Sequence, residues 1–353
     1  MMQQREYTVR FTTPAFPGNA EQSGQWRTPP FKALLRQWWR IARAASNQFN
    51  VNVTEMRQAE GLLFGNAWLE ENFRKSRVLL RLDRWDEGRL RQWPDAKSPG
   101  GNLTVHHPEA GRHGNNGGPV NASLYLGYGP LHYQGGNTRL KANAAIQAGE
   151  TAQLSIAVPE NDAALIWQAL WLMDRYGSLG GRSRNGWGSF ALTEANGQTI
   201  TPPDILRPWE QALTLDWPHA IGRDQNRPLI WQTGPHADWQ TLMQTLARIK
   251  IGLRTQFRFH GGNVANPENR HWLSYPVTNH RVNAWGNNAR LPNSLRFKVR
   301  PAPTGQGLVG VIFHVPCQPP ARFNPDQQAI KRVWNTVHAF LDQPAQNLTR
   351  IKE

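Results

Sequence analysis

Residues 27–40 read RTPPFKALLRQWWR, a segment that predicts a helix beginning at two prolines. Proline breaks a helix interior but suits the first turn, and Thr28 stands where a side-chain cap is expected. Beyond the prolines, apolar residues recur at steps of three and four, as on a buried helix face: Phe31, Leu34, Leu35, Trp38, Ile41, Ala42 and Ala45. We expect this helix to continue to about Ser46.

The same helix carries four cations on one stripe beside its apolar face: Lys32, Arg36, Arg40 and Arg43. No acidic residue occurs in residues 27–48, so the helix itself offers no compensating charge. Like charges four residues apart repel each other, and a partner outside the helix, such as a polyanion, is expected. An ordinary solvated basic face is the alternative. Trp38 and Trp39 are expected to pack in the core rather than to stack on bases.

The chain is long and strongly basic. Its 353 residues allow two domains and a sizeable core. The 40 Lys and Arg against 25 Asp and Glu give a net charge of +15, which favours nucleic acid or another polyanion as a partner. The 16 Trp, together with many Gly and Pro, indicate long loops on a packed scaffold rather than disorder.

The single cysteine, Cys317, excludes an intramolecular disulfide and a cysteine-based zinc cluster. We expect it to be a small buried residue. The first residues, MMQQREYTVRF, lack an apolar signal core, and no run of about 18 apolar residues predicts a transmembrane helix. These observations favour a reducing, cytoplasmic location, and we expect no cofactor and no metal.

Hydrophobic periodicity along the chain predicts an α+β fold. Strands are expected at residues 6–13, 78–82, 122–126, 152–158, 187–192, 212–217, 295–300 and 308–315. Further helices are expected at residues 54–63, 162–176, 238–252 and 327–341. Two polar excursions, 83–120 and 255–293, are expected as long loops, the first of them on the surface.

The order strand, helix, strands, helix, strand resembles a ferredoxin-like split β-α-β unit, and the second half of the chain repeats this order. Residues 199–208 contain three prolines and are expected to link the two passes. We therefore expect two ferredoxin-like (RRM-like) domains packed together, with long loop insertions. They would comprise residues 1–197, with the basic helix, and residues 209–353.

A second candidate element is the loop at residues 176–188, YGSLGGRSRNGWG, which we call the Gly-Arg loop. Its glycines allow positive φ and close approach of a ligand, and consecutive amides in such a turn can bind an anion. Arg182 and Arg184 add charge and bidentate phosphate geometry. A glycine-rich turn with two surface arginines is an equally good interpretation. The loop is not a P-loop, because no Gly-Lys-Ser/Thr follows, and it is not a dinucleotide fingerprint, because a helix precedes it.

Four segments follow one another along the chain in the same order as the motifs of a known protein family. They are the basic helix, EGLLFG at 60–65, SRV at 76–78 and the Gly-Arg loop. They resemble the RAMP proteins of type III-B CRISPR systems, and among them the family of the first Cmr subunit. That family has a K-G-x-L-R-x-W-W-R helix and a G-G-x-G-x-R-x-R-x-G-x-G loop. Ala33 replaces the motif's glycine, and Asn185 stands where a basic residue is common. RLPNS at 290–294 looks like a degraded R-x-x-S-P motif, so the resemblance covers the second domain weakly.

The resemblance implies a non-catalytic subunit of an RNA-guided effector in antiviral defence. Such a subunit contacts the 3′ part of the guide RNA, the target RNA and other Cmr subunits, and no membrane. Its RNA contacts are made to phosphates, because base pairing reads the sequence. Carried onto this chain, the RNA-binding residues are Lys32, Arg36, Arg40, Arg43, Gly180, Gly181, Arg182 and Arg184.

An enzyme is the competing class, because related RAMP proteins include metal-independent endoribonucleases that process guide RNA with a histidine acid or base. Of the loop histidines His106, His107, His113, His132, His260, His271 and His280, we consider His260 and His271 the strongest candidates. The carboxylates Asp83, Asp86 and Glu87 are expected in surface ion pairs rather than in a metal site. A third class, which overlaps the first, is a structural docking subunit in which Trp-rich loops contact partners, such as the loops that hold Trp231, Trp272 and Trp285.

Overall fold

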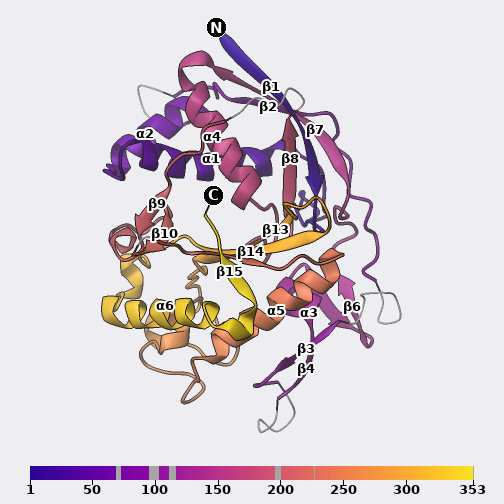
Figure 1. The fold of residues 1–353 in the computed structure, drawn as a ribbon, viewed down its shortest axis with the longest axis vertical. Helices are drawn as coiled ribbons and strands as arrows, with labels where there is room; N and C mark the ends of the chain where they lie inside the picture. Colours follow the sequence, from indigo (N-terminus) through magenta and orange to yellow (C-terminus); the bar gives the residue numbers. More distant parts are fainter. Residues whose placement is uncertain (69–72, 95–102, 111–116, 195–199, 226, 353) are drawn as a thin grey trace.

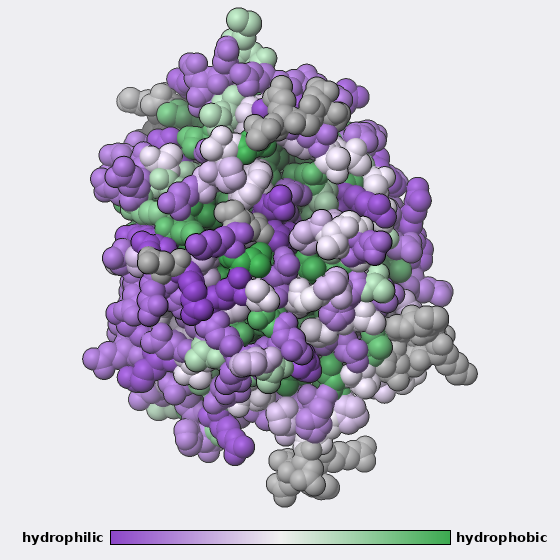
Figure 2. All heavy atoms as spheres, viewed as in Figure 1, coloured by the Kyte–Doolittle hydropathy of each residue, from purple (hydrophilic) through white to green (hydrophobic). Residues whose placement is uncertain are grey.

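The computed structural model describes residues 1–68, 73–94, 103–110, 117–194, 200–225 and 227–352. Two four-stranded antiparallel sheets, each with helices against it, make up most of the chain (Figure 1). The predicted α+β class is therefore confirmed. Hydrophilic residues cover most of the face seen in Figure 2, in keeping with the net charge of +15.

The first sheet has the order β2-β7-β1-β8, and its neighbouring strands are antiparallel. Its strands are β1 (Met2–Phe11), β2 (Leu79–Leu82), β7 (Thr151–Pro159) and β8 (Phe190–Glu194). Alternate residues of β1, namely Tyr7, Val9 and Phe11, are buried in the core, as the period of two requires. Helices α1 (Thr28–Ser46), α2 (Val53–Phe64) and α4 (Glu160–Tyr176) lie together on one side of this sheet (Figure 1).

The second sheet repeats this arrangement with the order β13-β14-β12-β15. Its strands are β12 (Ile230–Thr233), β13 (Leu295–Pro301), β14 (Leu308–His314) and β15 (Leu348–Arg350), again antiparallel. Its helices are α5 (Trp239–Thr255) and α6 (Gln327–Leu341). When the strands are numbered within each sheet, both sheets have the spatial order two, three, one, four.

The remaining elements are short. Two hairpins pair β3 (Thr104–His107) with β4 (Gly118–Asn121) and β5 (Leu131–Gln134) with β6 (Asn137–Leu140). A small sheet joins β9 (Leu206–Pro208), β10 (Ile221–Asp224) and β11 (Arg227–Pro228). Helix α3 spans Ala122–Gly127, and the 3-10 helices are η1 (Gln211–Thr214), η2 (Asn269–Trp272), η3 (Asn283–Trp285), η4 (Ala321–Phe323) and η5 (Pro344–Gln346).

Helix α1 forms where residues 27–40 predicted it, with prolines in its first turn. The cap differs, because Arg27 occupies the N-cap position without a side-chain hydrogen bond and Thr28 is already helical. Trp38 and Trp39 are at most 1% exposed, which confirms their expected place in the core. Trp38 packs against Tyr176 and against Phe313 of the second sheet, so α1 contributes to both halves of the molecule.

Three other predictions were wrong. Residues 122–126 form helix α3 rather than a strand, because the Asn121 side chain accepts a hydrogen bond from the Leu124 amide and caps a helical turn. Residues 212–217 contain the 3-10 helix η1 instead of a strand. The described part of 83–120 is not a surface loop throughout, because Trp93 and Val105 are buried in the same core cluster as α5.

The two sheets meet at strands β8 and β13. The two strands are not paired with each other, and hydrogen bonds that involve side chains join the sheets there. The Thr12 hydroxyl donates to the Val299 carbonyl at 2.8 Å, and the Val299 amide donates to the Ser189 hydroxyl at 2.9 Å. The ammonium of fully buried Lys298 donates to the carbonyls of Phe190, at 2.6 Å, and Gly177. Burial lowers the pKa of Lys298 to about 7. These bonds fix the start of the Gly-Arg loop against the second sheet.

Candidate functional site

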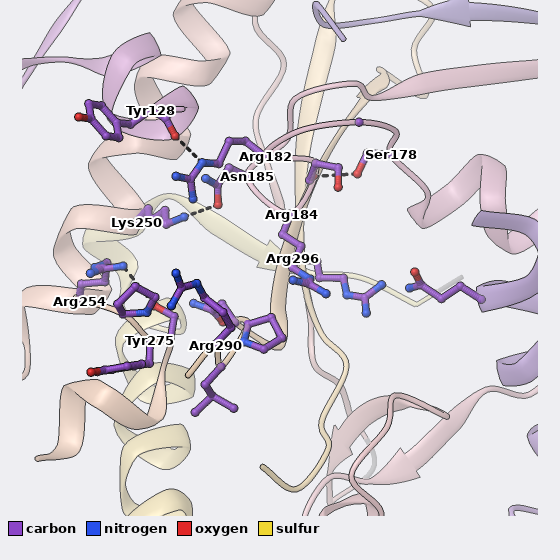
Figure 3. A pocket seen from close by; sticks show the side chains of 18 of the residues that line it. Tyr128, Ser178, Arg182, Arg184, Asn185, Lys250, Arg254, Tyr275, Arg290 and Arg296 are labelled. Atoms are coloured by element: carbon purple, nitrogen blue, oxygen red, sulfur yellow. Dashed lines mark hydrogen bonds between the residues drawn. The ribbon is translucent and has the colours of Figure 1, made fainter. Parts of the chain in front are cut away.

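A cleft of about 820 Å³ lies where α1, the Gly-Arg loop, α5 and β13 meet (Figure 3). We call it the basic cleft, because six cations line it: Arg182, Arg184, Lys250, Arg254, Arg290 and Arg296. None of the described residues that line it is Asp or Glu. A concave site with one sign of charge concentrates the electrostatic potential and attracts ligands of the opposite sign.

Burial lowers the pKa of four cations of the basic cleft, and neighbouring cleft cations lower it further for Arg296 and Lys250. Burial, together with the neighbouring Arg184, lowers the pKa of Arg296 to about 9. Burial also lowers the pKa of Arg184 and of Arg254. The pKa of Lys250 is held well below its ordinary value by burial and then by the charges of Arg254 and Arg182. Charged forms are therefore disfavoured in the free protein, and an anion in the cleft would relieve this cost.

Hydrogen bonds within the chain hold the Gly-Arg loop in place. The Ser178 hydroxyl donates to the Ser183 carbonyl at 2.8 Å, and the Phe297 amide of β13 donates to the Arg184 carbonyl at 3.0 Å. Arg182 has φ of +58° and its Nε donates to the Tyr128 carbonyl at 2.5 Å. Hydrogen bonds therefore join the Gly-Arg loop to Tyr128, which follows α3, and to Phe297 in the second sheet.

The glycines of this loop serve its own packing. Gly180 and Gly188 have φ of +87° and +65°, and a Cβ on Gly188 would lie 1.8 Å from the Leu179 carbonyl oxygen. The Gly181 amide donates to the Phe16 carbonyl at 3.0 Å, and the Gly188 amide donates to the Pro14 carbonyl at 2.8 Å. Those two amides are therefore not available to an anion, and the arginine side chains are the ligand-facing groups of the loop.

The cations of the α1 stripe find a partner inside the chain. Glu60 of α2 is 5% exposed and accepts hydrogen bonds from Arg36 Nε at 2.7 Å and Arg40 Nη2 at 2.7 Å. Although burial raises the pKa of Glu60, the hydrogen bonds from Arg40 and Arg36 outweigh it and the pKa is lowered. Arg43 lies over the Trp39 ring at 5.5 Å. The compensating charge that the stripe requires is therefore supplied, at least for two cations, by a carboxylate rather than by a polyanion.

The stripe and the Gly-Arg loop also do not converge as expected. The residues of α1 that line the basic cleft are Leu34, Gln37 and Trp38, and none of the four stripe cations does so. Arg36 and Arg40 are directed to Glu60 on α2, and each side chain remains about 40% exposed. Of the expected RNA-binding residues, the structure therefore brings Gly180, Arg182 and Arg184 into the cleft, and it leaves Gly181 and the four stripe cations outside the lining.

The sequence model of the RAMP superfamily matches residues 8–191, which is more than half of the chain. The chain belongs to the RAMP superfamily. No protein of curated function matches the sequence.

Among solved structures, this RAMP protein is similar to Cmr1 from Pyrococcus furiosus in its apo form, with 15% identity, a TM-score of 0.43, and coverage of 88% of this chain and 87% of that chain. It is similar to a chain of the type III-B Cmr-beta complex bound to cognate target RNA, with 10% identity, a TM-score of 0.49, and coverage of 95% and 99%. It is also similar to a chain of a type IV-B CRISPR complex, with 15% identity, a TM-score of 0.30, and coverage of 61% and 100%.

Half of the basic cleft lies outside the region that the RAMP model matches. Lys250 and Arg254 come from α5, Arg290 from the 255–293 excursion, and Arg296 from β13. Sequence reasoning placed none of the four in a site, although it noted Arg290 as the first residue of the RLPNS segment. The available signal was weak: Lys250 and Arg254 are four residues apart on one helix face, and Arg296 alternates with the core residues Leu295 and Phe297 in a strand that is buried along most of its length.

The histidine candidates for catalysis do not share a site with the basic cleft. His271 is fully buried in η2, where its Nδ1 accepts from the Glu268 amide at 2.9 Å and its Nε2 meets the His280 carbonyl at 3.1 Å. Both ring nitrogens are thus used for structure. His260 is 90% exposed, with its Nδ1 3.6 Å from a Glu268 oxygen. His113 lies outside the described residues.

The carboxylate and tryptophan candidates also have structural roles. Asp86 pairs with Arg84 and Glu87 pairs with Arg91, as expected for surface ion pairs. Over the described ranges, no three His, Cys, Asp or Glu side chains gather where they could hold a metal ion. Trp231 and Trp272 are at most 4% exposed, so these two side chains pack in the core of the chain. No helix in the described part of the chain is both long and apolar enough to cross a membrane.

Proposed function

We propose that this RAMP protein is a non-catalytic RNA-binding subunit of a type III-B CRISPR (Cmr) effector complex. The observation that carries the proposal is the basic cleft, whose lining has six cations and no carboxylate among the described residues. A polyanion is the partner that such a lining fits. Membership of the RAMP superfamily and the motifs of residues 27–40 and 176–188 support the choice of guide and target RNA.

The proposed architecture is a pair of ferredoxin-like domains, residues 1–197 and 209–353. The shared strand order of the two antiparallel sheets supports it, because each sheet follows the chain order strand, helix, strand, strand, helix, strand. The basic cleft then lies at the junction of the two domains, a common place for a ligand site.

In this proposal, Arg182 and Arg184 bind RNA phosphates together with the cations of α5 and β13. Gly180 lines the cleft beside them, and Gly181 supports the loop through the hydrogen bond from its amide to the Phe16 carbonyl. Lys32, Arg36, Arg40 and Arg43 add a basic surface beside the cleft, although Glu60 shares the charge of Arg36 and Arg40. Guide RNA, target RNA and the other Cmr subunits are the proposed partners.

The experiment is binding and cleavage in one assay. Purified protein is mixed with labelled single-stranded RNA and with repeat-containing RNA, across a salt series, with and without magnesium. We expect binding without cleavage, with log affinity falling with log salt by about 0.7 for each phosphate contacted. Arg182→Ala plus Arg184→Ala should weaken binding without unfolding the protein, whereas the exposed Arg248→Ala on α5 is the matched control.

Two results would contradict the proposal. Affinity that is unchanged in the double variant would show that the loop does not bind RNA. Cleavage that survives a chelator and is lost in His260→Ala would favour the metal-independent endoribonuclease instead.

A further inference from the structure

We propose that the free edge of β2 docks an extended, acidic segment of another protein chain, which pairs with β2 as an added strand of the first sheet. We call this surface the β2 edge surface, and its apolar side chains are Trp68, Phe73 and Leu79. The inference rests on the proposed function, because another subunit of the same effector complex is the source of the segment. None of the three side chains lines the basic cleft.

The two edges of the first sheet differ in what lies against them. Strand β8 forms one edge, and the Lys298 ammonium of β13 donates to its Phe190 carbonyl, which joins this edge to the second sheet. Strand β2 forms the other edge and, among the described residues, pairs with β7 alone. An edge strand keeps backbone donors and acceptors along its outer side, where a strand from a partner can be added.

Three large apolar side chains beside this edge face solvent. Trp68, Phe73 and Leu79 are 43%, 71% and 55% exposed. Leu79 is the first residue of β2 and lies opposite Ala157 of β7. Single exposed apolar residues are common on protein surfaces, but these three come from one short segment that leads into a free strand edge. That combination is a hazard for aggregation unless a partner covers it, and so it indicates an interface.

Two glycines of α2 hold this segment in place. A Cβ on Gly61 would lie 3.1 Å from the Trp68 ring, so the absence of a side chain lets the indole pack on the helix. Gly65 ends α2 with φ of +91°, and a Cβ there would lie 2.9 Å from the Ser76 amide nitrogen. The EGLLFG and SRV segments therefore meet at the β2 edge surface. A side chain already fixed by packing loses little entropy when a partner binds.

The charge of the surface determines the kind of partner. Residues 73–81, FRKSRVLLR, contain four cations and no Asp or Glu. Arg77 forms an ion pair with Asp162, whereas Arg74, Lys75 and Arg81 are exposed and pair with no carboxylate of the described residues. Opposite charges on neighbouring strands attract and like charges repel, so the added strand should carry Asp or Glu. The same repulsion disfavours the β2 edge of a second copy of this chain.

RNA fits this surface less well than a protein strand does. Phosphates would contact the cations, but an RNA backbone cannot repeat the alternating donors and acceptors of a strand edge. Leu79 also offers no ring on which a base could stack. An added strand satisfies both features, because its backbone pairs with β2 while alternate side chains pack on the exposed apolar ones.

The test measures assembly in cells that co-express the other effector subunits with two forms of this protein, the wild type and one variant of different mass. The ratio of the two forms in the purified complex, divided by their ratio in the cell extract, gives the loss of affinity. We expect Leu79→Asp and Arg81→Glu each to be incorporated about fivefold less than wild type or worse, because each removes a central contact of the interface.

Matched controls remove the same kind of side chain elsewhere. Val53 is 48% exposed at the start of α2, far along the helix from Gly61 and Gly65, and Arg248 is exposed on α5. We expect Val53→Asp and Arg248→Glu to be incorporated within about twofold of wild type. All four variants should keep the RNA affinity of the wild type, because the basic cleft is unchanged.

A second measurement identifies the partner segment and does not depend on a disruptive substitution. Benzoylphenylalanine replaces Leu79, and light activates it in the assembled complex. Mass spectrometry should then find crosslinks to a segment of another subunit in which Asp or Glu alternate with apolar residues.

The outcomes separate the two proposals. Incorporation of both Leu79→Asp and Arg81→Glu at the level of wild type overturns the inference and leaves the proposed function standing. Crosslinks from position 79 to RNA alone, to a second copy of this chain or to no chain also overturn it. If the wild type does not join the other subunits at all, the proposed function fails, and the inference fails with it.

Discussion

Replacing Arg296 with Met should stabilise the RNA-free protein and weaken its RNA binding. Burial, with Arg184 beside it, lowers the pKa of Arg296 from the ordinary value of a guanidinium to about 9. Each pKa unit is about 1.4 kcal/mol, so the folded state carries roughly 5 kcal/mol of unfavourable free energy for keeping this side chain charged. The hydrogen bonds to Gln37 offset about 1 kcal/mol of it. We expect a net gain of about 1–4 kcal/mol, the range found when buried ion pairs are replaced by well-packed apolar side chains.

The assay is urea unfolding followed by tryptophan fluorescence at pH 7. The measurement is made at pH 7 because the cost of the charged guanidinium is fully present there. Folding lowers the pKa of Arg296, so its charged form is unfavourable in the folded protein at every pH below about 9. Above pH 9 the folded protein releases the proton while the unfolded chain keeps it, so the difference between wild type and Arg296→Met should shrink. Arg248→Met is the control, because it also removes one positive charge but at an exposed position on α5. It should change stability by less than about 0.5 kcal/mol.

A loss of stability in Arg296→Met would refute this reasoning. It would show that the guanidinium is a structural element whose hydrogen bonds outweigh its burial. A gain of stability with unchanged RNA affinity would show that the charge is costly but not used for RNA. Only the combination of a more stable protein and weaker RNA binding agrees with a residue kept for its ligand.

Three further predictions concern the elements around the cleft. Glu60→Gln should lower the free energy of unfolding by about 2 kcal/mol, because it leaves two half-buried arginines without their carboxylate; urea unfolding measures it, and a neutral result would contradict the ion-pair network. Lys298, whose pKa is lowered from 10.5 to about 7, should make wild-type stability rise between pH 7 and 10 relative to Lys298→Met, because folding releases its proton there; parallel pH curves would exclude this. Gly188→Ala should lower the melting temperature strongly, since its Cβ would lie 1.8 Å from the Leu179 carbonyl oxygen; soluble protein with a wild-type melting temperature would contradict the loop geometry.

Helices were predictable from the sequence where the apolar period is long and the ends are marked. Helix α6 spans Gln327–Leu341, as its apolar period predicts, and the Asp326 side chain caps it. Residues 122–126, ASLYL, are too few for a period to separate strand from helix. There the structure depends on the Asn121 cap and on packing against α5, and packing against a distant helix cannot be seen in a short window.

For a related reason, only the two loop arginines among the six cations of the basic cleft were predicted from the sequence as site residues. Arg182 and Arg184 stand in a glycine-rich loop, where charge between glycines is itself a signal. Lys250 lies on a helix and Arg296 in a strand, where the pattern of neighbours indicates ordinary secondary structure. Their role follows only from the approach of α5 and β13 to the loop, which is fixed by contacts such as the Phe297 amide to the Arg184 carbonyl.

The placement of carboxylates, more than the number of cations, distinguishes the two basic elements of this chain. Both the α1 stripe and the Gly-Arg loop are locally free of acidic residues in the sequence. In the fold, Glu60 comes from α2 to meet Arg36 and Arg40, and no described carboxylate comes to line the cleft around Arg184 and Arg296. Because unpaired buried charge is costly, a fold that leaves it in place needs a compensating partner from outside. The cleft is therefore a stronger candidate for RNA than the helix whose cations first suggested it.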